Sequence, residues 1–431
     1  MIPQIKQRIE QIRRGEVPEG YKNTKGGIVP DEWVEDNLGR YLSEYKKLSN
    51  DIEKYPVYSS SRQGLIPQSK YYDNREAVET CVGYKIVPTG YVTYRHMSDD
   101  DIFHFNVNRT GGKILVSSEY PVFTVSDKGE LGYIVPMLND TARFRYFCRT
   151  QKLGGTRTRL YYKNLCTYRA AFPTYPEQKK IADILSAQDK VIELQQKKID
   201  ELKRLKKVYL SKMFPKKGCN VPEIRFPGFT DPWEQRKLGE MGQTYTGLSG
   251  KTKDDFGHGQ ARFVTYMNVY SNPISNPEMT EPIEIDPKQN EVEVGDVFFT
   301  TSSETPEEVG MSSILLEKRG KTYLNSFCFG FRPSEKIDRY YLAYMLRSES
   351  ARAKITLLAQ GISRYNISKN KVMEIAVSLP SLDEQKMIGQ YFSQLDNLIT
   401  LHQRKCDEEK QKKKALMQLL LTGIVRVEVK Q

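Results

Sequence analysis

Two short segments of this chain combine glycine, a hydroxyl side chain and arginine. Residues 154–157 read Gly-Gly-Thr-Arg, and residues 361–364 read Gly-Ile-Ser-Arg. Glycine lets a backbone approach a ligand closely, a hydroxyl can bond phosphate, and the guanidinium fork fits phosphate or guanine. Each copy stands just ahead of a long helical segment, so the repeat predicts two nucleic-acid contact sites. The alternative is an arginine that ties its loop to the helix by a salt bridge.

Basic and polar residues around these segments extend the predicted contacts. A further loop over residues 247–253 carries two lysines, Lys251 and Lys253, that we expect at the DNA backbone. The predicted DNA-contacting residues are Thr156, Arg157, Arg159, Lys163, Lys251, Lys253, Ser363, Arg364, Tyr365 and Lys369.

Motifs for methyl transfer and nucleotide binding are missing. An adenine methyltransferase needs an Asn/Asp-Pro-Pro-Tyr/Phe motif and a glycine-rich loop for the methyl donor. Residues 272–274 and 276–278 are the nearest approaches, but both lack the second proline and the aromatic residue, so we interpret them as turns. Residues 247–252, Gly-Leu-Ser-Gly-Lys-Thr, have two residues between the glycines where a phosphate-binding loop has four.

Carboxylates give no consistent nuclease or metal site either. Asp31 followed by Glu44 and Lys46 could hold Mg²⁺ beside a phosphate, but the matching Asp231 has no such Glu-x-Lys partner. The run 99–101 of three aspartates is interpreted as an acidic loop in a basic domain. We therefore predict no catalytic, cofactor-binding or metal-binding residue in this chain.

An internal duplication organises the sequence. Asp31 and Trp33 recur as Asp231 and Trp233, an offset of 200, and the glycine–arginine segments recur at an offset of 207. The longest match pairs residues 176–215 with 383–422, which agree at 15 of 40 positions. Each half therefore consists of a mixed region of short strand-like and helical runs followed by one long segment without an internal proline.

The two long segments, 177–214 and 384–421, predict helices of about 57 Å each. Their apolar residues recur at heptad spacing, and a helix of that length with one apolar stripe needs a partner. We predict that the two helices pack antiparallel, with a mixed domain at each end, although each could be a surface helix of its own domain. The residues predicted for helix pairing and subunit docking are Leu185, Ile192, Ile199, Leu202, Tyr209, Phe392, Leu395, Ile399, Leu416 and Leu420.

Bulk composition agrees with a DNA-binding protein. The formal net charge of +12 favours a polyanionic partner, although a merely basic enzyme would share it. Six scattered cysteines, Cys81 among them, form no Cys-x-x-Cys pair, which predicts a reducing cytoplasm and no zinc site. No membrane span or signal peptide is expected. Ile2, Ile5, Ile9 and Ile12 predict a short N-terminal helix that either pads the helix pair or offers a partner surface.

The layout resembles the specificity (S) subunits of type I restriction-modification systems over essentially the whole chain. The resemblance rests on the Pro-Glu-Gln-Lys and Asp-Glu-Gln-Lys helix starts, on residues 226–230 (Phe-Pro-Gly-Phe-Thr) leading into Trp233, and on residues 415–423. It implies two target recognition domains that read a bipartite, asymmetric double-stranded DNA site. It also implies docking of two methyltransferase subunits, which carry S-adenosylmethionine, and of nuclease/translocase subunits, which use ATP and Mg²⁺.

The predicted fold is therefore α/β (mixed α+β), with two similar domains separated by two long antiparallel helices in a pseudo-two-fold arrangement. The first target recognition domain covers 1–175, the first spacer helix 176–215, the second domain 216–382, the second spacer helix 383–423 and a C-terminal tail 424–431. The helix length would set the gap between the DNA half-sites. Two alternatives are a self-contained methyltransferase or nuclease and a non-specific DNA-bridging coiled-coil protein.

Overall fold

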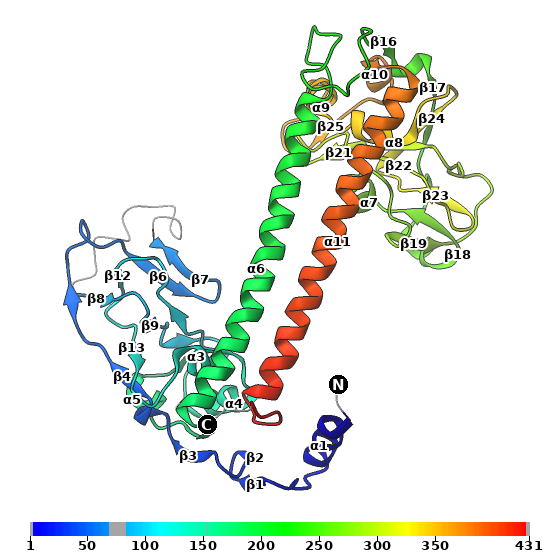
Figure 1. The fold of residues 1–431 in the computed structure, drawn as a ribbon. Helices are drawn as coiled ribbons and strands as arrows, with labels where there is room; N and C mark the ends of the chain where they lie inside the picture. Colours follow the sequence, from blue (N-terminus) through cyan, green and yellow to red (C-terminus); the bar gives the residue numbers. More distant parts are fainter. Residues whose placement is uncertain (1–2, 69–82, 153, 428–431) are drawn as a thin grey trace. The chain divides into compact units, whose positions relative to one another are not determined.

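Figure 1 shows the computed structural model, which describes residues 3–68, 83–152 and 154–427. The chain forms two compact units, Met1–Leu194 with Lys405–Gln431 and Gln195–Arg404. Each unit is a mixed α/β domain that includes one end of each long helix, α6 (Tyr175–Lys212) and α11 (Leu382–Leu420). Cys81 and residues 428–431 of the predicted C-terminal tail lie outside the described residues.

The first unit is built mainly of short strands. Its helices other than α6 and α11 are α1 (Pro3–Arg13), α3 (Leu131–Asp140), α4 (Ala142–Thr150) and α5 (Tyr162–Leu165). Its strands are β1 (Tyr21–Thr24), β2 (Gly27–Pro30), β3 (Val34–Asn37), β4 (Leu42–Glu44), β5 (Leu48–Ser49), β6 (Tyr58–Ser61), β7 (Gly64–Pro67), β8 (Tyr84–Val87), β9 (Val92–Thr93), β10 (Met97–Ser98), β11 (Asn106–Val107), β12 (Ile114–Val116), β13 (Val122–Val125), β14 (Thr158–Arg159) and β15 (Arg169–Phe172). The helix predicted at the N-terminus is α1, and none of its residues is buried.

The second unit is also built of strands and short helices, and its longest strand has nine residues. Its other helices are α7 (Tyr266–Ser271), α8 (Arg339–Met345), α9 (Glu349–Thr356) and α10 (Lys369–Met373). Its strands are β16 (Glu234–Lys237), β17 (Gly242–Thr246), β18 (Phe256–Val264), β19 (Thr280–Ile283), β20 (Val297–Thr300), β21 (Ser302–Ser303), β22 (Ser312–Ile314), β23 (Thr322–Leu324), β24 (Cys328–Pro333), β25 (Tyr365–Asn366) and β26 (Ala376–Leu379).

The duplication seen in the sequence recurs in the sheet topology. The four-stranded antiparallel sheet β4-β13-β9-β11 of the first unit has the same order as β17-β24-β20-β22 of the second. Two further antiparallel pairs also correspond, β3·β15 to β16·β26 and β10·β14 to β21·β25. The strands of these shared sheets therefore occur in the same order before the long helix of each unit.

The three-stranded sheets differ between the units. In the first unit, β12-β8-β5 is antiparallel throughout. In the second, β18 pairs antiparallel with β19, through a register shift between Phe256 and Ala261, and parallel with β23. The parts of the chain between the shared strands have thus diverged in structure as well as in sequence.

The two long helices pack against each other in both units, as the heptad pattern predicts. In the first unit the Gln188 amide donates to the Glu409 carboxylate at 2.6 Å, and Lys413 pairs with Asp189 at 2.6 Å. Farther along α6, the Cys406 thiol lies 4.0 Å from the Ile192 carbonyl oxygen. The two helices are antiparallel, because the contacted residue of α11 moves back from 413 to 406 as α6 advances from Asp189 to Ile192.

The second unit continues the same antiparallel pattern. Lys206 pairs with Asp396 at 2.6 Å, and the rings of Tyr209 and Tyr391 meet edge to face at 5.3 Å. Six of the residues predicted for helix pairing are buried: Leu185, Ile199, Leu202, Phe392, Leu395 and Leu420. The other four, Ile192, Tyr209, Ile399 and Leu416, are half-buried. The predicted mixed α/β fold with two packed long helices is confirmed, whereas the spacing that the helices would set on DNA stays a prediction.

Local chemistry explains where the long helices end. Proline cannot continue a helix, and glycine readily takes the left-handed conformation that closes one. Helix α6 ends three residues before Pro215, and α11 ends three residues before Gly423, whose φ is +74°. Within the described residues no helix is both long and apolar enough to cross a membrane.

A buried ion pair stands at the start of each long helix. Glu177 and Glu384, in the first turns of α6 and α11, are 1% and 0% exposed. Arg426 donates to both oxygens of Glu177 at 2.7 and 2.9 Å, and Arg225 donates to both oxygens of Glu384 at 2.8 Å. Each arginine comes from the segment that follows the other long helix, so each pair joins stretches of chain that are far apart in sequence.

The glutamine beside each buried glutamate satisfies backbone groups of the domain. Gln178 accepts from the backbone N–H of Glu130, the N-cap of α3, and Gln385 accepts from that of Asp338, the N-cap of α8. Their amides donate to the carbonyls of Pro173 and Pro380. The Glu-Gln dipeptide thus fixes each long helix to its domain through hydrogen bonds with little exposure to water.

We expect Arg225→Met to destabilise the second unit by about 3–5 kcal/mol, because it leaves the Glu384 carboxylate buried without its partner. The double variant Arg225→Met/Glu384→Gln should recover most of that loss, since the uncompensated charge is gone. Calorimetric unfolding of the full chain measures both changes.

Arg236→Met is the matched control, because Arg236 also forms a bidentate pair, at 2.6 Å with Glu335, but both partners are partly exposed. Its effect should be much smaller. Equal losses for Arg225→Met and Arg236→Met would show that burial of the Glu384 pair does not matter.

Candidate nucleic-acid interface

The two glycine–arginine segments occupy equivalent places in the two units. In the first unit, residues 154–157 lead into β14, which pairs with β10 in the register Ser98↔Thr158. In the second, residues 361–364 lead into β25, which pairs with β21 in the register Ser303↔Tyr365. The structure thus presents each motif as a loop on the same two-stranded ladder.

The backbone of each loop depends on glycine. Gly154 and Gly155 have φ values of +93° and +80°. In the second unit a Cβ on Gly361 would lie 2.0 Å from the Arg364 carbonyl oxygen, so only glycine fits. Backbone hydrogen bonds between Gln360 and Asn366 close that loop at 2.9 and 3.0 Å. The tip is presented to solvent, as the 96% exposure of Ile362 shows.

In the first unit the motif arginine is engaged by the acidic run. The Arg157 side chain donates to Asp99 at 2.8 Å, and both groups are more than half exposed. Asp100 pairs with Arg62, and Asp101 accepts from the Thr158 hydroxyl. The aspartates are therefore bonded to groups of the same unit, and the salt bridge of Arg157 holds a loop to a loop rather than to the long helix.

In the second unit the motif borders a cavity of about 410 Å³. The guanidinium of Arg364 lies 5.7 Å from the centre of the Phe327 ring. Carboxylates, hydroxyls and aromatic rings line the cavity together with this arginine. The lining residues are Tyr266, Met267, Tyr270, Ser302, Ser303, Glu304, Glu308, Ser363 and Arg364. The cavity therefore offers hydrogen-bond donors, acceptors and apolar surface together.

A fixed carboxylate lies in this cavity. Glu308 accepts hydrogen bonds from the Tyr270 hydroxyl at 2.6 Å and from the Ser303 hydroxyl at 3.2 Å. Hydrogen bonds from Tyr270 and Thr305 lower the pKa of the Glu308 carboxyl below its ordinary value. The same bond raises the pKa of Tyr270. Glu308 is therefore an ionised, acceptor-only group near neutral pH.

The other predicted contacts are dispersed around these loops. Thr156, Arg159 and Lys163 are exposed beside the first loop, and Tyr365 and Lys369 are half-buried beside the second. Lys253 is exposed at the first residue of a short 3-10 helix, Lys253–Asp255. Their assignment to DNA contacts stays a prediction.

Lys251 has a different environment from the one its sequence context suggests. Its ammonium pairs with Asp286 at 3.0 Å and with Asp255 at 3.6 Å, and its side chain is 12% exposed. The hydrogen bond to Asp286 raises the pKa of Lys251. Lys251 therefore holds its own loop to the unit, and its predicted contact with the DNA backbone stays untested.

The sequence identified the acidic run 99–101 but did not place it beside the first loop, and sequence reasoning missed Glu304 beside the second. Asp99 and Glu304 each directly follow a serine at the end of the short strand, an offset of 205. The same offset separates two segments that match in sequence, 87–92 and 292–297. That signal was available, but nothing in the sequence showed that Asp99 bonds to Arg157 or that Glu304 lines one cavity with Arg364.

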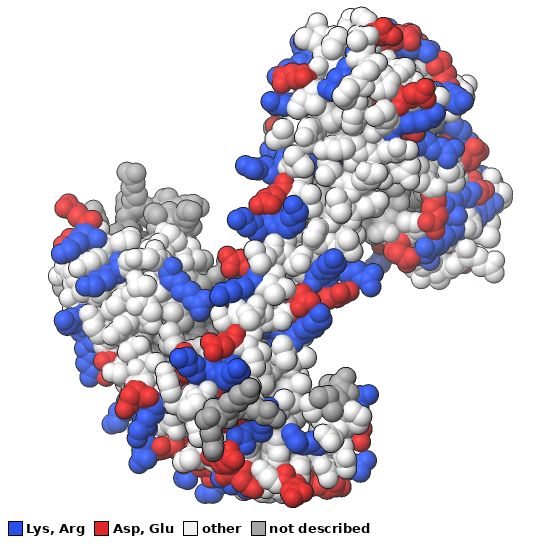
Figure 2. Space-filling view, viewed as in Figure 1, with Lys and Arg blue, Asp and Glu red and all other residues white. Residues whose placement is uncertain are grey.

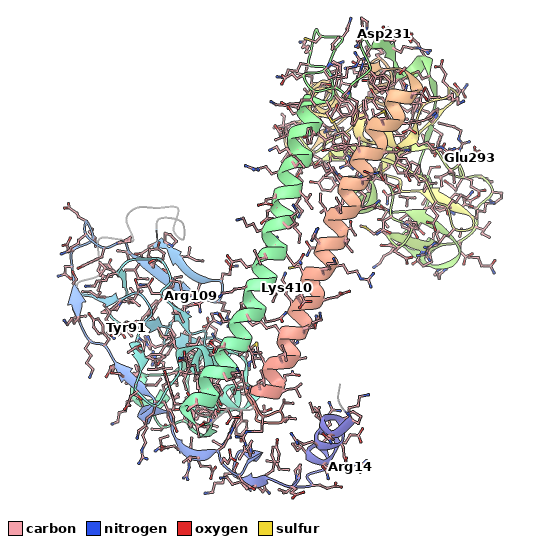
Figure 3. The ribbon with its side chains drawn as sticks, in the orientation of Figure 1. Arg14, Tyr91, Arg109, Asp231, Glu293 and Lys410 are labelled. Atoms are coloured by element: carbon pink, nitrogen blue, oxygen red, sulfur yellow. The ribbon has the colours of Figure 1, made fainter. Side chains whose placement is uncertain are left out.

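Charge on the surface is mixed rather than gathered in one patch. Figure 2 shows Lys and Arg over both units, interspersed with Asp and Glu on the face that is drawn. Figure 3 shows labelled side chains of both signs, such as Asp231 ahead of β16 and Lys410 on α11. Among the described residues no group of three or more His, Cys, Asp or Glu could hold a metal ion.

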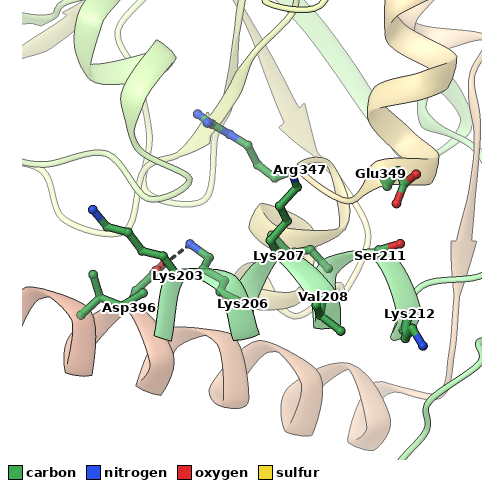
Figure 4. A pocket seen from close by; sticks show the side chains of 11 residues that line it. Lys203, Lys206, Lys207, Val208, Ser211, Lys212, Arg347, Glu349 and Asp396 are labelled. Carbon is green, nitrogen blue, oxygen red and sulfur yellow. Dashed lines mark hydrogen bonds and ion pairs between the residues drawn. The ribbon is translucent and has the colours of Figure 1, made fainter. Parts of the chain in front are cut away.

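A larger cavity, about 720 Å³, lies in the second unit beside the end of α6 (Figure 4). Its lysine-rich wall includes Lys206, which is paired with Asp396. Arg347 also lines it, but its guanidinium donates to the backbone carbonyls of Ser312 and Val269 at 2.7 and 2.8 Å. Both cations are therefore bonded to groups of the same unit.

Comparison with known proteins agrees with this arrangement. The family model for the type I restriction modification DNA specificity domain matches residues 39–204 and 230–410. The chain is 23% identical over 454 residues to the type I restriction enzyme MjaVIII specificity subunit of Methanocaldococcus jannaschii, covering 95% of this chain and 96% of that protein. It is 25% identical over 446 residues to an MjaX specificity subunit of the same organism, covering 95% and 97%.

Two solved structures share the fold. One, from work on assembly and conformational transition of the type I R-M system, has a TM-score of 0.54 and 15% identity, covering 92% of this chain and 99% of that chain. The other is the type I restriction-modification S subunit from M. genitalium, with a TM-score of 0.51 and 14% identity, covering 92% and 97%. With the family model matching both halves, this chain belongs to the type I restriction-modification specificity family, and it is the non-catalytic subunit that gives such a DNA-binding complex its sequence specificity.

Proposed function

We propose that the chain reads a bipartite, asymmetric site in double-stranded DNA, one half through each unit. The observation that carries this proposal is the recurrence of the glycine–arginine loop on the same two-stranded ladder in both units. The first target recognition domain is assigned to 1–175 and the second to 216–382, with spacer helices over 176–215 and 383–423 and a tail over 424–431. The asymmetry follows from the loops, because Arg157 faces Asp99 whereas Arg364 borders an acidic cavity.

The long helices carry a duplicated apolar surface that supports docking of two methyltransferase subunits. Val191 and Leu194 on α6 are 40% and 65% exposed, and the equivalent Leu398 and Leu401 on α11 are 43% and 46% exposed. Each pair is spaced i, i+3 and so lies on one helix face. Exposed apolar pairs at equivalent positions of a repeat fit two copies of one partner.

Catalysis then belongs to the partners of this chain. The methyltransferase subunits would carry S-adenosylmethionine and methylate adenine, and nuclease/translocase subunits would join with ATP and Mg²⁺ for cleavage. This chain binds none of these cofactors in the proposal. We place the complex in the cytoplasm, where its DNA substrate is found.

Arg157→Ala and Arg364→Ala should each weaken specific DNA binding by about 1–3 kcal/mol if the arginine reads a base edge. Because both halves of the site are needed, either substitution should also reduce methylation by the reconstituted complex. Fluorescence anisotropy at fixed salt measures the binding, and methylome sequencing measures the modified motif.

Arg236→Ala is the control, because Arg236 is partly exposed, lies outside both loops and is paired with Glu335. Replacing residues 16–175 by a different recognition domain should change one half of the motif only. If both halves changed together, or if binding were independent of sequence, the two-headed reader would be wrong.

Leu194→Glu and Leu401→Glu should each remove one methyltransferase subunit from the complex, and the double variant should remove both. The reason is that a charge placed on an apolar contact must be desolvated when the partner docks. Native mass spectrometry of the assembled complex counts the subunits.

Ile285→Glu is the matched control for docking, because Ile285 is 47% exposed but lies in the second unit away from both long helices. An unchanged subunit count in the Leu194→Glu/Leu401→Glu double variant would show that the partners bind elsewhere.

A further inference from the structure

The cavity beside Arg364 combines groups that match the edge of one kind of base pair. Its fixed carboxylate, Glu308, accepts only, and the hydroxyls of Tyr270, Ser303 and Thr305 already occupy three of the roughly four lone-pair directions of its oxygens. The remaining direction can accept one hydrogen bond from a ligand that lies in the cavity. Arg364, on the loop that borders the cavity, offers only donors.

We propose that this cavity reads a G·C base pair in the half-site of the second unit, with Glu308 accepting from the cytosine amino group and Arg364 donating to the guanine. The inference deepens the proposed DNA-reading function and rests on it. In the major groove guanine presents two acceptors, N7 and O6, which suit the arginine fork, and its paired cytosine presents one amino donor, which suits a carboxylate.

The carboxylates argue against a phosphate contact at this place. Glu304 and Glu308 both line the cavity, and their negative charges repel a phosphate. Thymine presents an acceptor, O4, in the groove, which an ionised carboxylate also rejects. The cavity therefore selects a base edge that donates, and Arg364 favours the base pair whose other member is guanine.

The walls of the cavity support this role. Tyr266 and Tyr270 lie on one face of α7 with their rings nearly parallel, 6.2 Å apart and at 15°. The Tyr266 hydroxyl donates to the Ser302 carbonyl at 2.7 Å, which fixes α7 to the ladder that carries the arginine loop. Met267, 53% exposed, adds apolar surface at the rim. The wall thus offers apolar surface beside the carboxylate.

The first unit differs at the corresponding place, so the two half-sites should be read differently. Asp99, which corresponds to Glu304, bonds directly to Arg157 at 2.8 Å. That acid is therefore already paired with the motif arginine. In the second unit the fixed acid is paired with hydroxyl groups, and Arg364 lies over Phe327 instead.

A scan with base analogues tests the inference on the unaltered complex. In duplexes that carry the target site, each cytosine of the second unit's half-site is replaced in turn by 2-pyrimidinone, which lacks the amino group. At one position we expect affinity to fall by about tenfold or more. The same replacement in the gap between the half-sites controls for weaker base pairing. If no cytosine position is sensitive, the inference is overturned.

A substitution tests the residue itself. Glu308→Gln supplies an amide N–H that can donate to thymine O4, so methylome sequencing should show that one position of the second half-site relaxes from cytosine to cytosine or thymine. Glu307→Gln makes the same change of charge one residue away, outside the cavity lining, and should leave the motif unchanged. An active Glu308→Gln complex with the original motif would refute the role of Glu308. Failure of the proposed function would show differently, as unaltered chain that directs no methylation to a two-part site.

Discussion

The buried carboxylate at the start of each long helix is the interaction on which the rest of the structure depends. Glu177 and Glu384 each lie almost fully out of water, and such a charge is tolerated only when it is paired and hydrogen-bonded. Arg426 and Arg225 supply that pairing from the segment after the other long helix. A single dipeptide thus requires the helix, its domain and a distant stretch of chain to come together, and it does so once in each unit.

Away from these anchored helix starts, the two units differ in structure. The four-stranded sheets and the ladder under each arginine loop have the same order in both units, whereas the three-stranded sheets differ in strand direction and register. A rigid shared framework with divergent surface segments is the usual way in which one fold supports different recognition. The pairing of Arg157 with Asp99 in one unit and the acidic cavity beside Arg364 in the other express this divergence at the contact site itself.

A DNA-binding protein with acidic residues beside its arginines binds DNA less tightly but discriminates better between base sequences. Phosphate contacts supply much of the binding energy but no sequence information. Carboxylates such as Glu308 and Asp99 weaken the attraction to any phosphate. The arginines therefore contribute most where a base pair offers a donor to the carboxylate and acceptors to the arginine. The mixed charge on the drawn surface agrees with this balance.

The sequence by itself determined the duplication, the long helices and the family. Each of these rests on repeated segments or on periodic spacing of apolar residues, which can be seen directly in the order of the residues. It also placed the arginine loops, since glycine followed by Arg157 or Arg364 is visible locally. Only the tertiary structure decided which groups those arginines meet. Asp99 is separated from Arg157 by 58 residues and Glu308 from Tyr270 by 38, and only the folding of each unit brings these partners together. The same reason explains Lys251, whose basic loop suggested a DNA contact but whose charge is paired with Asp286, a partner set by the fold rather than by local sequence.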